Sequence, residues 1–242
     1  MGSPQSTVTN FGTVNGTITM SGTGSVFNEG AINGGGTAIN FTSGPGPFTL
    51  TLAPGFSITG NVLGTGSDTL QLGDSQITRS LFGTFNVSNI GPGQQYQGFS
   101  VFNKIGTSVW TLTGSGAQNW TISGGTLIGD TNSLQGPAIT NNAALAFSQS
   151  FAGTYAGSVG GSGAVTVQGG GTVVFTGANT YSGGTTINSA TLQLGNGGAS
   201  GSIVGDVVDN GTFTINRSDT FTFANTISGT GAFVQAGSGL RS

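Results

Sequence analysis

Apolar and polar residues alternate with a period of two along much of this 242-residue chain. In residues 48–52 (FTLTL) and 69–72 (TLQL), every second residue is apolar and the residues between are Thr or Gln. Successive side chains of a β-strand point to opposite faces, so this pattern predicts strands with one buried and one exposed face. The same pattern predicts further strands at residues 17–20, 110–113, 191–194 and 220–223.

Glycine-rich corners separate the predicted strands. Examples are Gly34–Gly36, Gly124–Gly125, the Asn15–Gly16 pair and the run Asp209–Gly211. Glycine and asparagine adopt the positive φ angles that a sharp bend requires. Hairpins could use the same corners, so the distance between repeated segments must distinguish an antiparallel meander from a solenoid.

The second half of the chain repeats itself at long range. Residues 142–147 (NAALAF) return in type at 210–215 (NGTFTI), a shift of 68, and residues 158–164 return at 226–232 with the same shift. Two weaker pairs of segments are related by shifts of 65 and 63. A unit of that size divides into about three coils of roughly 20 to 23 residues. One such unit cannot bury its apolar face until a neighbour stacks on it, and the repeat therefore predicts a parallel β-solenoid.

The solenoid predicts which side chains form the core and where the coils are irregular. In the first half, residues 10–16 and 28–34 are related by a shift of only 18, so the coils there are expected to be less regular. Residues 91–98 (GPGQQYQG) break the alternation and are expected to project as a loop. The predicted inward residues are Leu50, Leu52, Leu70, Leu72, Trp110, Leu112, Val173, Phe175, Leu192, Leu194, Phe213, Ile215, Phe221 and Phe223.

Composition narrows the alternatives to this fold. The 48 glycines disfavour helices, while 34% hydrophobic residues, with 16 Phe among them, argue against disorder. The net charge is -3, and the basic residues Arg79, Lys104, Arg217 and Arg241 are scattered, so we expect no nucleic-acid partner. The chain has no Cys and no His, which excludes disulfides and the usual transition-metal ligands. No apolar run reaches 18 residues, so no membrane span is expected.

Few residues of this chain could take part in catalysis. Serine catalysis needs a base, and without His the only basic partner of that kind is Lys104. The one cluster that could serve a glycan-cleaving enzyme is Asp206, Asp209, Arg217 and Asp219. Its structural alternative is a set of turn-capping carboxylates with one surface ion pair. We therefore predict no catalytic residue, no cofactor and no metal site, and the chain is expected not to be an enzyme.

Five aromatic residues could instead stack on sugar rings: Trp110, Trp120, Tyr96, Tyr155 and Tyr181. Trp110 alternates in phase with Leu112, and Trp120 with Ile122, so both tryptophans are expected in the core. Tyr96, in the irregular segment, is the best candidate for an exposed aromatic.

One segment is specific enough to name a family. Residues 169–187 (GGGTVVFTGANTYSGGTTI) resemble the passenger-associated repeat of bacterial type V autotransporters. A weaker copy runs from 104 to 127, and a third begins at 229 and stops at Leu240. The chain departs from the family pattern at Ser189-Ala190, where a glycine is usual, and the weaker copy lacks the Asn-Thr-Tyr corner.

The resemblance implies a right-handed parallel β-helix, which we expect to be one continuous rod. Residues 1–79 would form less regular N-terminal coils, and residues 80–242 would form coils with passenger-associated repeats that are truncated at the C-terminus. The family further implies an extracellular or bacterial cell-surface location, with the signal peptide and the translocator barrel missing from this sequence.

The function expected from this family is a non-enzymatic adhesin or self-aggregation rod. An inert spacer and a glycan-cleaving β-helix enzyme remain as alternatives. Expected partners are a second rod, bound side by side or end to end, or a glycan or protein of a host or cell surface.

Overall fold

A computed structural model describes residues 5–77 and 80–239 of the chain. Arg79, Arg241 and the stop at Leu240 lie outside these residues, and so does the predicted division after residue 79, which stays a prediction. The chain separates into two compact units, unit 1 (residues 1–111) and unit 2 (residues 112–242).

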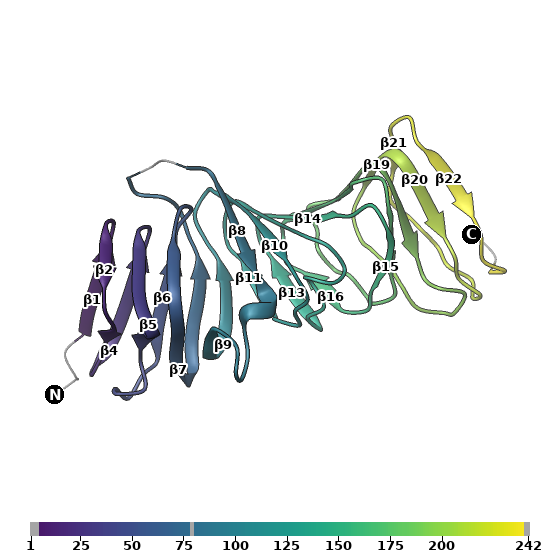
Figure 1. Ribbon diagram of the computed structural model, residues 1–242. Helices are drawn as coiled ribbons and strands as arrows, with labels where there is room; N and C mark the ends of the chain where they lie inside the picture. Colours follow the sequence, from purple (N-terminus) through teal and green to yellow (C-terminus); the bar gives the residue numbers. More distant parts are fainter. Residues whose placement is uncertain (1–4, 78–79, 240–242) are drawn as a thin grey trace. The chain divides into compact units, whose positions relative to one another are not determined.

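Unit 1 consists of short strands, two longer bent strands and one helical turn (Figure 1). The bent strands β5 and β7 each turn a corner of the coil and therefore contribute to two of its sides. The elements are β1 (Gln5–Asn10), β2 (Thr13–Asn15), β3 (Ile18–Thr19), β4 (Thr23–Asn28), β5 (Ala31–Asn40), β6 (Phe48–Leu52), β7 (Ser57–Leu72), β8 (Phe82–Asn86), the 3-10 turn η1 (Val87–Asn89), β9 (Tyr96–Lys104) and β10 (Val109–Thr113), the last of which reaches the unit boundary.

Strands of unit 1 pair in parallel with the strand one coil further along the chain. Gln5 of β1 pairs with Thr23 of β4, and Gly24 pairs with Phe48 of β6. Thr49 then pairs with Thr69 of β7. These steps differ in length (18, 24 and 20 residues from the paired numbers), which agrees with the irregularity expected for the first half of the chain.

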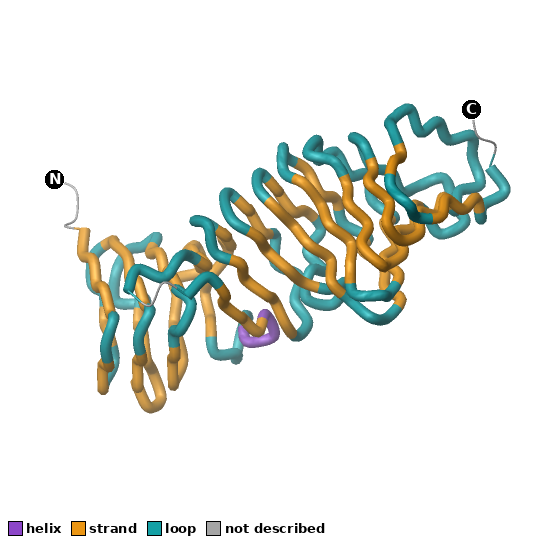
Figure 2. Tube along the Cα trace, turned by 90° about the horizontal axis from the view of Figure 1, so that it is seen from above, coloured by secondary structure: helices purple, strands orange, loops and turns teal. Residues whose placement is uncertain are grey.

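Unit 2 is more regular. Figure 2 shows its strands in orange, lying in successive turns that short teal corners connect. The strands are β11 (Trp120–Ile122), β12 (Thr126–Gly129), β13 (Ala138–Asn141), β14 (Ala144–Ser148), β15 (Ala152–Tyr155), β16 (Ser158–Gly160), β17 (Ala164–Gln168), β18 (Thr172–Phe175), β19 (Thr185–Leu194), β20 (Val207–Ile215), β21 (Ile227–Ser228) and β22 (Ala232–Gln235).

The strand pairs of unit 2 confirm the parallel solenoid and its coil length. Leu145 pairs with Val165, Val165 with Thr185, and Thr185 with Val207, always in parallel. The coils are therefore 20, 20 and 22 residues long by these residue numbers, as the repeat predicted. Inward residues of paired strands are in register from one coil to the next, so their side chains form columns, most of which are apolar.

The segments that resemble each other at a shift of 68 do not lie in the same column. Leu145 resembles Phe213 at a shift of 68, but the register places Leu145 in the column of Val207, a shift of 62 (207 minus 145). Phe213 instead lies in the column of Leu192 and Val173, one strand further around the coil. Segments that look alike in sequence thus lie on neighbouring sides of the solenoid, because every side has the same inward-outward alternation.

The core matches the prediction at most positions. Twelve of the fourteen predicted inward residues are buried, and the exceptions are Phe221 and Phe223. These two residues are only half-buried, because the strand expected at 220–223 does not form. The Phe221 ring lies 4.4 Å from the guanidinium carbon of Arg217, and the Phe223 ring lies 5.5 Å from that of Phe213.

The irregular segment at 91–98 is only partly a loop. Residues 91–95 form turns, but β9 already begins at Tyr96, and Tyr96 is 3% exposed. Its ring packs against Phe85 with the centroids 5.2 Å apart. The expectation of an exposed aromatic is therefore wrong: polar neighbours suggested a loop, but the ring fills an inward position.

Candidate functional site

The repeat-like segment 169–194 contains β18, a corner and β19. The structure explains the unusual residues of this corner. The corner begins after β18, where a Cβ atom on Gly177 would lie 1.9 Å from the carbonyl oxygen of Gly157 in the preceding coil. Only glycine allows the backbones of the two coils to approach so closely. The same requirement recurs at Gly136 and Gly157, whose Cβ atoms would lie 2.2 Å and 2.5 Å from carbonyl oxygens of preceding coils.

Asn179 fastens three consecutive coils together. Its Oδ1 accepts a hydrogen bond from the Val159 N–H at 2.8 Å in the preceding coil. Its Nδ2 donates to the carbonyl oxygens of Gly177 at 3.2 Å and Ser202 at 3.0 Å, the latter in the next coil. Asn179 is 1% exposed, so these bonds satisfy backbone groups that water does not reach.

Tyr181 and Thr185 complete the corner. The Tyr181 hydroxyl lies 2.7 Å from Thr185 Oγ1, and both side chains are buried. Burial raises the pKa of Tyr181, and the bond with Thr185 opposes this rise only in part. Tyr181 is therefore a neutral core residue and offers no ionised group for chemistry.

Ser189, which stands with Ala190 where the family pattern has a glycine, adopts an unfavourable backbone conformation. Its φ is +50°, the only positive φ at a described non-glycine residue, and it lies in a bulge of β19. A side chain in the left-handed region costs about 1 kcal/mol. We expect Ser189→Gly to raise the free energy of unfolding by about 0.5 to 1 kcal/mol, measured by urea denaturation. An unchanged or lower urea midpoint would contradict this.

Further amides hold coils together in the same way. Asn10 Nδ2 donates to the Ala31 carbonyl oxygen at 3.0 Å, and Asn141 Nδ2 donates to that of Ala164 at 2.8 Å. Gln149 accepts from the Thr131 N–H and donates to the Thr172 carbonyl oxygen. Sequence reasoning missed these residues. Their signal is an Asn two residues before a Gly or Ala corner, which is too common in this chain to stand out.

The four residues proposed as an enzyme-like cluster are not joined into one site. Asp206 accepts a hydrogen bond from the Thr226 N–H of the next coil, and Asp209 caps its own corner by accepting one from the Gly211 N–H. Arg217 and Asp219 form a separate ion pair, with 2.7 Å between Nη2 and Oδ2. No hydrogen bond or ion pair in the described part of the chain links Asp206 or Asp209 to Arg217.

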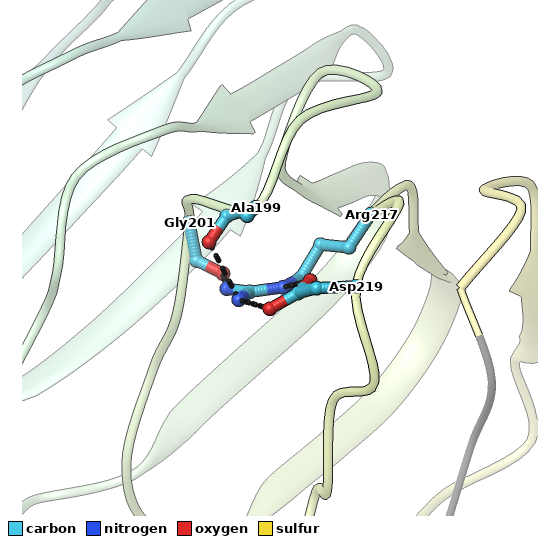
Figure 3. Close-up of polar contacts among 4 residues, drawn as sticks. All are labelled: Ala199, Gly201, Arg217 and Asp219. Carbon is cyan, nitrogen blue, oxygen red and sulfur yellow. Dashed lines mark hydrogen bonds and ion pairs between the residues drawn. The ribbon is translucent and has the colours of Figure 1, made fainter.

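Arg217 acts as a clamp on the loop that follows β19 (Figure 3). Its Nη1 donates to the Gly201 carbonyl oxygen at 2.6 Å, and its Nη2 donates to that of Ala199 at 2.7 Å. Nε and Nη2 also donate to the two oxygens of Asp219, and this hydrogen bond holds the pKa of Asp219 below its usual value. Arg217 is 8% exposed, and its Nε, Nη1 and Nη2 atoms all donate hydrogen bonds to these partners. The guanidinium is therefore not available to an incoming anion.

These hydrogen bonds depend on the guanidinium group, which presents several N–H donors in one planar fork. We expect Arg217→Lys to lower the free energy of unfolding by about 1 to 2 kcal/mol, because a single ammonium cannot reach both carbonyl oxygens and Asp219 together. Thermal denaturation measures this effect. Ser218→Ala is a matched control at the adjacent exposed residue, and a Lys variant as stable as this control would refute the clamp.

Six of the seven acidic residues accept hydrogen bonds from backbone N–H groups. They are Glu29, Asp68, Asp74, Asp130, Asp206 and Asp209. The seventh, Asp219, pairs with Arg217. Carboxylates bound in this way stabilise the corners of the coils. Within residues 5–77 and 80–239, no group of three or more acidic residues is placed to hold a metal ion.

Asp74 and Lys104 lie at one corner of unit 1, and both have shifted pKa values. Partial burial acts against ionisation of Asp74, but hydrogen bonds from Thr107 and Ser108 outweigh it and lower the pKa to about 2. Burial lowers the pKa of Lys104 to about 8, although the charge of Asp74 opposes this. The Lys104 Nζ donates to the Ile105 carbonyl oxygen at 2.6 Å. Lys104 is fully buried.

The lowered pKa of Lys104 predicts a pH dependence of stability. Between pH 8 and 10.5 the unfolded chain holds a proton that the folded chain has lost, so stability rises with pH in this range. We expect the rise from pH 8 to 10 to be about 1 to 2 kcal/mol and to vanish in Lys104→Met. Urea denaturation across this range measures the difference. Burial raises the pKa values of Tyr96, Tyr155 and Tyr181, which lowers stability at higher pH in both proteins. Parallel pH profiles for the two proteins would contradict the prediction.

Both tryptophans are core residues, as expected. Trp110 is fully buried and donates its Nε1–H to the Gly73 carbonyl oxygen at 2.9 Å, while Trp120 is 1% exposed. Neither ring is free to stack on a sugar. Among the described residues, no helix is long and apolar enough to cross a membrane.

Outward residues form columns that are rich in hydroxyl groups. Thr172, Thr191 and Thr212 pair with one another in successive strands of unit 2, and Thr166 pairs with Thr186. These residues are partly exposed on the outer face. Stacked coils with hydroxyl-bearing outer columns define a parallel β-solenoid.

Comparisons with known proteins agree with this class. The family model described as "Passenger-associated-transport-repeat" matches residues 165–194, which contain the Gly177–Asn179–Tyr181 corner. The chain is also 47% identical over 55 residues to the "Adhesin BmaC autotransporter" of Brucella suis biovar 1 (strain 1330). That match covers 23% of this chain and 2% of the relative. No solved structure matches the chain.

Residues 165–194 thus match the passenger-associated repeat that the sequence indicated, and a short segment of the chain is similar to an autotransporter adhesin. The family implies a location at the cell surface or outside the cell.

Proposed function

We propose that this chain is a non-enzymatic adhesive segment that mediates attachment or cell-cell aggregation at the bacterial surface. The observation that carries the proposal is the set of in-register threonine columns on the outer face of unit 2. Such columns present many weak hydrogen-bonding groups without charge, which suits broad contact with a glycan, a protein or a second copy of the chain. The matched relative carries the name adhesin, which is consistent with this role.

The arrangement of the acidic residues supports the non-enzymatic part of the proposal. Six carboxylates are engaged by backbone N–H groups and the seventh by Arg217. A glycan-cleaving enzyme would need two carboxylates facing one bond, roughly 5 to 10 Å apart in a shared cleft. Glycan breakdown by the purified protein that Asp206→Asn and Asp209→Asn abolish would overturn this part.

The adhesive part can be tested on displayed protein. Thr191→Lys with Thr212→Lys places two charges in the column of Thr172, Thr191 and Thr212, which we call the central column, and leaves the inward residues unchanged. Bacteria that display this variant should sediment or attach less than those displaying the original chain. Thr121→Lys with Thr140→Lys is the matched control, because it adds the same charges to a column on another side of the same unit. Far-UV circular dichroism of the purified variants checks that both remain folded.

The outcomes distinguish adhesion from a spacer role. Loss of attachment in the first variant only would support contact through the central column. Display that causes no attachment or sedimentation above that of cells without the chain would favour an inert spacer and refute the proposal.

A further inference from the structure

Three corners of the chain are built alike, but one of them carries a carboxylate in place of an amide. In each, the side-chain Oδ1 accepts a hydrogen bond from the N–H two residues further on. The bonds are Gly12 to Asn10 at 3.1 Å, Ala143 to Asn141 at 3.2 Å, and Gly211 to Asp209 at 2.9 Å. The corner at Asp209 therefore has the local geometry of an asparagine corner.

The difference lies in the bond to the next coil. At Asn141, Nδ2 donates to the Ala164 carbonyl oxygen at 2.8 Å, and the Gly163 N–H donates back to the Asn141 carbonyl oxygen. At Asp209, the Gly231 N–H donates to the Asp209 carbonyl oxygen at 2.8 Å, so Ala232 takes the place of Ala164. A carboxylate oxygen cannot donate to a carbonyl as the amide nitrogen does.

Asp209 accordingly has a polar atom without a partner. Its Oδ2 is buried and makes no hydrogen bond, although the residue is only 2% exposed. A Cβ built on Gly231 would lie 2.4 to 2.7 Å from the carboxylate atoms, so the backbone of the next coil lies directly against this group. An unpaired buried polar atom opposes the docking of the coil that buries it.

That coil, residues 226–235, contains β21 and β22. Two of its residues, Ile227 and Phe233, lie in the inward columns of Val207 and Phe213 but are 37% and 38% exposed. This coil covers the unsatisfied carboxylate of Asp209.

We propose that residues 226–235 form a coil that opens ahead of the rest of unit 2, and that Asp209 is the residue that sets this weakness. Opening leaves the main-chain edge of β20 unpaired while the coils before it stay closed. Local opening of this kind is governed by the free energy of the contacts at one boundary, so a single side chain can change it.

Hydrogen exchange of the purified chain, followed by mass spectrometry, tests the proposal. Amides of residues 227–235 should exchange faster than those of β19 in the original protein. Asp209→Asn supplies the missing donor and should slow exchange in 227–235 by about tenfold or more, with little change in β19. The converse variant Asn141→Asp should speed exchange in residues 158–168, the coil that Asn141 holds.

Asp206→Asn is the matched control, because it removes the same charge from the same corner region but keeps the acceptor for the Thr226 N–H. It should leave exchange in 227–235 within about twofold of the original. Equal slowing by Asp206→Asn and Asp209→Asn would attribute the effect to charge and overturn the proposal. No slowing in Asp209→Asn, with circular dichroism unchanged, would overturn it as well.

Discussion

Trp110→Ala is expected to lower the free energy of unfolding by about 3 to 5 kcal/mol, the largest effect of any single substitution considered for this chain. The indole is fully buried, and its ring lies 6.0 Å from that of Phe56. A Cβ on Gly83 would lie only 2.6 Å from the ring, which shows how closely the neighbouring strand packs on it. Removing the ring leaves a cavity and also leaves the Gly73 carbonyl oxygen without its indole donor. Urea denaturation monitored by circular dichroism measures the loss.

Two companion variants separate the causes of this loss. Trp110→Phe keeps most of the ring volume but removes the hydrogen bond to Gly73, so it should cost less than Trp110→Ala. Phe82→Ala removes an aromatic ring that is 72% exposed and should change stability by no more than about 0.5 kcal/mol. A Trp110→Ala protein as stable as the Phe82→Ala protein would show that the ring is not part of the core.

Asn179→Ala is expected to lower the free energy of unfolding by about 2 to 4 kcal/mol. The substitution leaves the buried Val159 N–H without an acceptor and removes two bonds to the carbonyl oxygens of Gly177 and Ser202. The loss of stability should be confined to three coils, because the bonds join Asn179 to its own coil and to the coils on either side. Hydrogen exchange of the Val159 amide, together with the urea midpoint, measures it.

Substitutions at and near Asn179 provide the controls. Asn188→Ala in the same coil removes an exposed asparagine and should change stability by no more than about 0.5 kcal/mol. Asn179→Asp keeps the acceptor for Val159 but directs a carboxylate oxygen at two carbonyl oxygens, so it should not restore stability. A fully stable Asn179→Asp protein would mean that the donated bonds contribute nothing.

Local alternation was a reliable guide to the strands, and it failed where the reason is visible. The predicted strands at 48–52, 69–72 and 191–194 form, because a neighbouring coil covers each of them. The pattern at 220–223 is equally good, but no strand forms there: the Phe221 ring packs against the guanidinium of Arg217, and Phe221 and Phe223 are only half-buried.

Register could not be predicted because corner length varies between coils. Gln168, Asn188 and Asn210 lie in one column, and Thr172, Thr191 and Thr212 lie in the next. The corner between these columns contains three, two and one residues in successive coils, as the residue numbers show. A repeat read from sequence counts residues, whereas stacking aligns strands and lets the corners absorb the difference.

Composition predicted no catalytic site, which stays a prediction, and it did not reveal the structural role of the charged residues. Composition showed that Asp206, Asp209, Arg217 and Asp219 are the only cluster of their kind. It could not show that Arg217 would spend its donors on the carbonyl oxygens of Gly201 and Ala199. Those partners are main-chain atoms, which every residue has, so no side-chain pattern marks them.

The sequence by itself determined the class of fold and the resemblance to the passenger-associated repeat, because alternation, glycine corners and the repeat-like segment are local properties of the chain. The tertiary structure alone decided which coils pair, which amides join them and where a polar atom is left without a partner. These features depend on how one coil lies on the next, and that placement follows from the summed lengths of the corners and the close contact of backbones, which no short stretch of sequence contains.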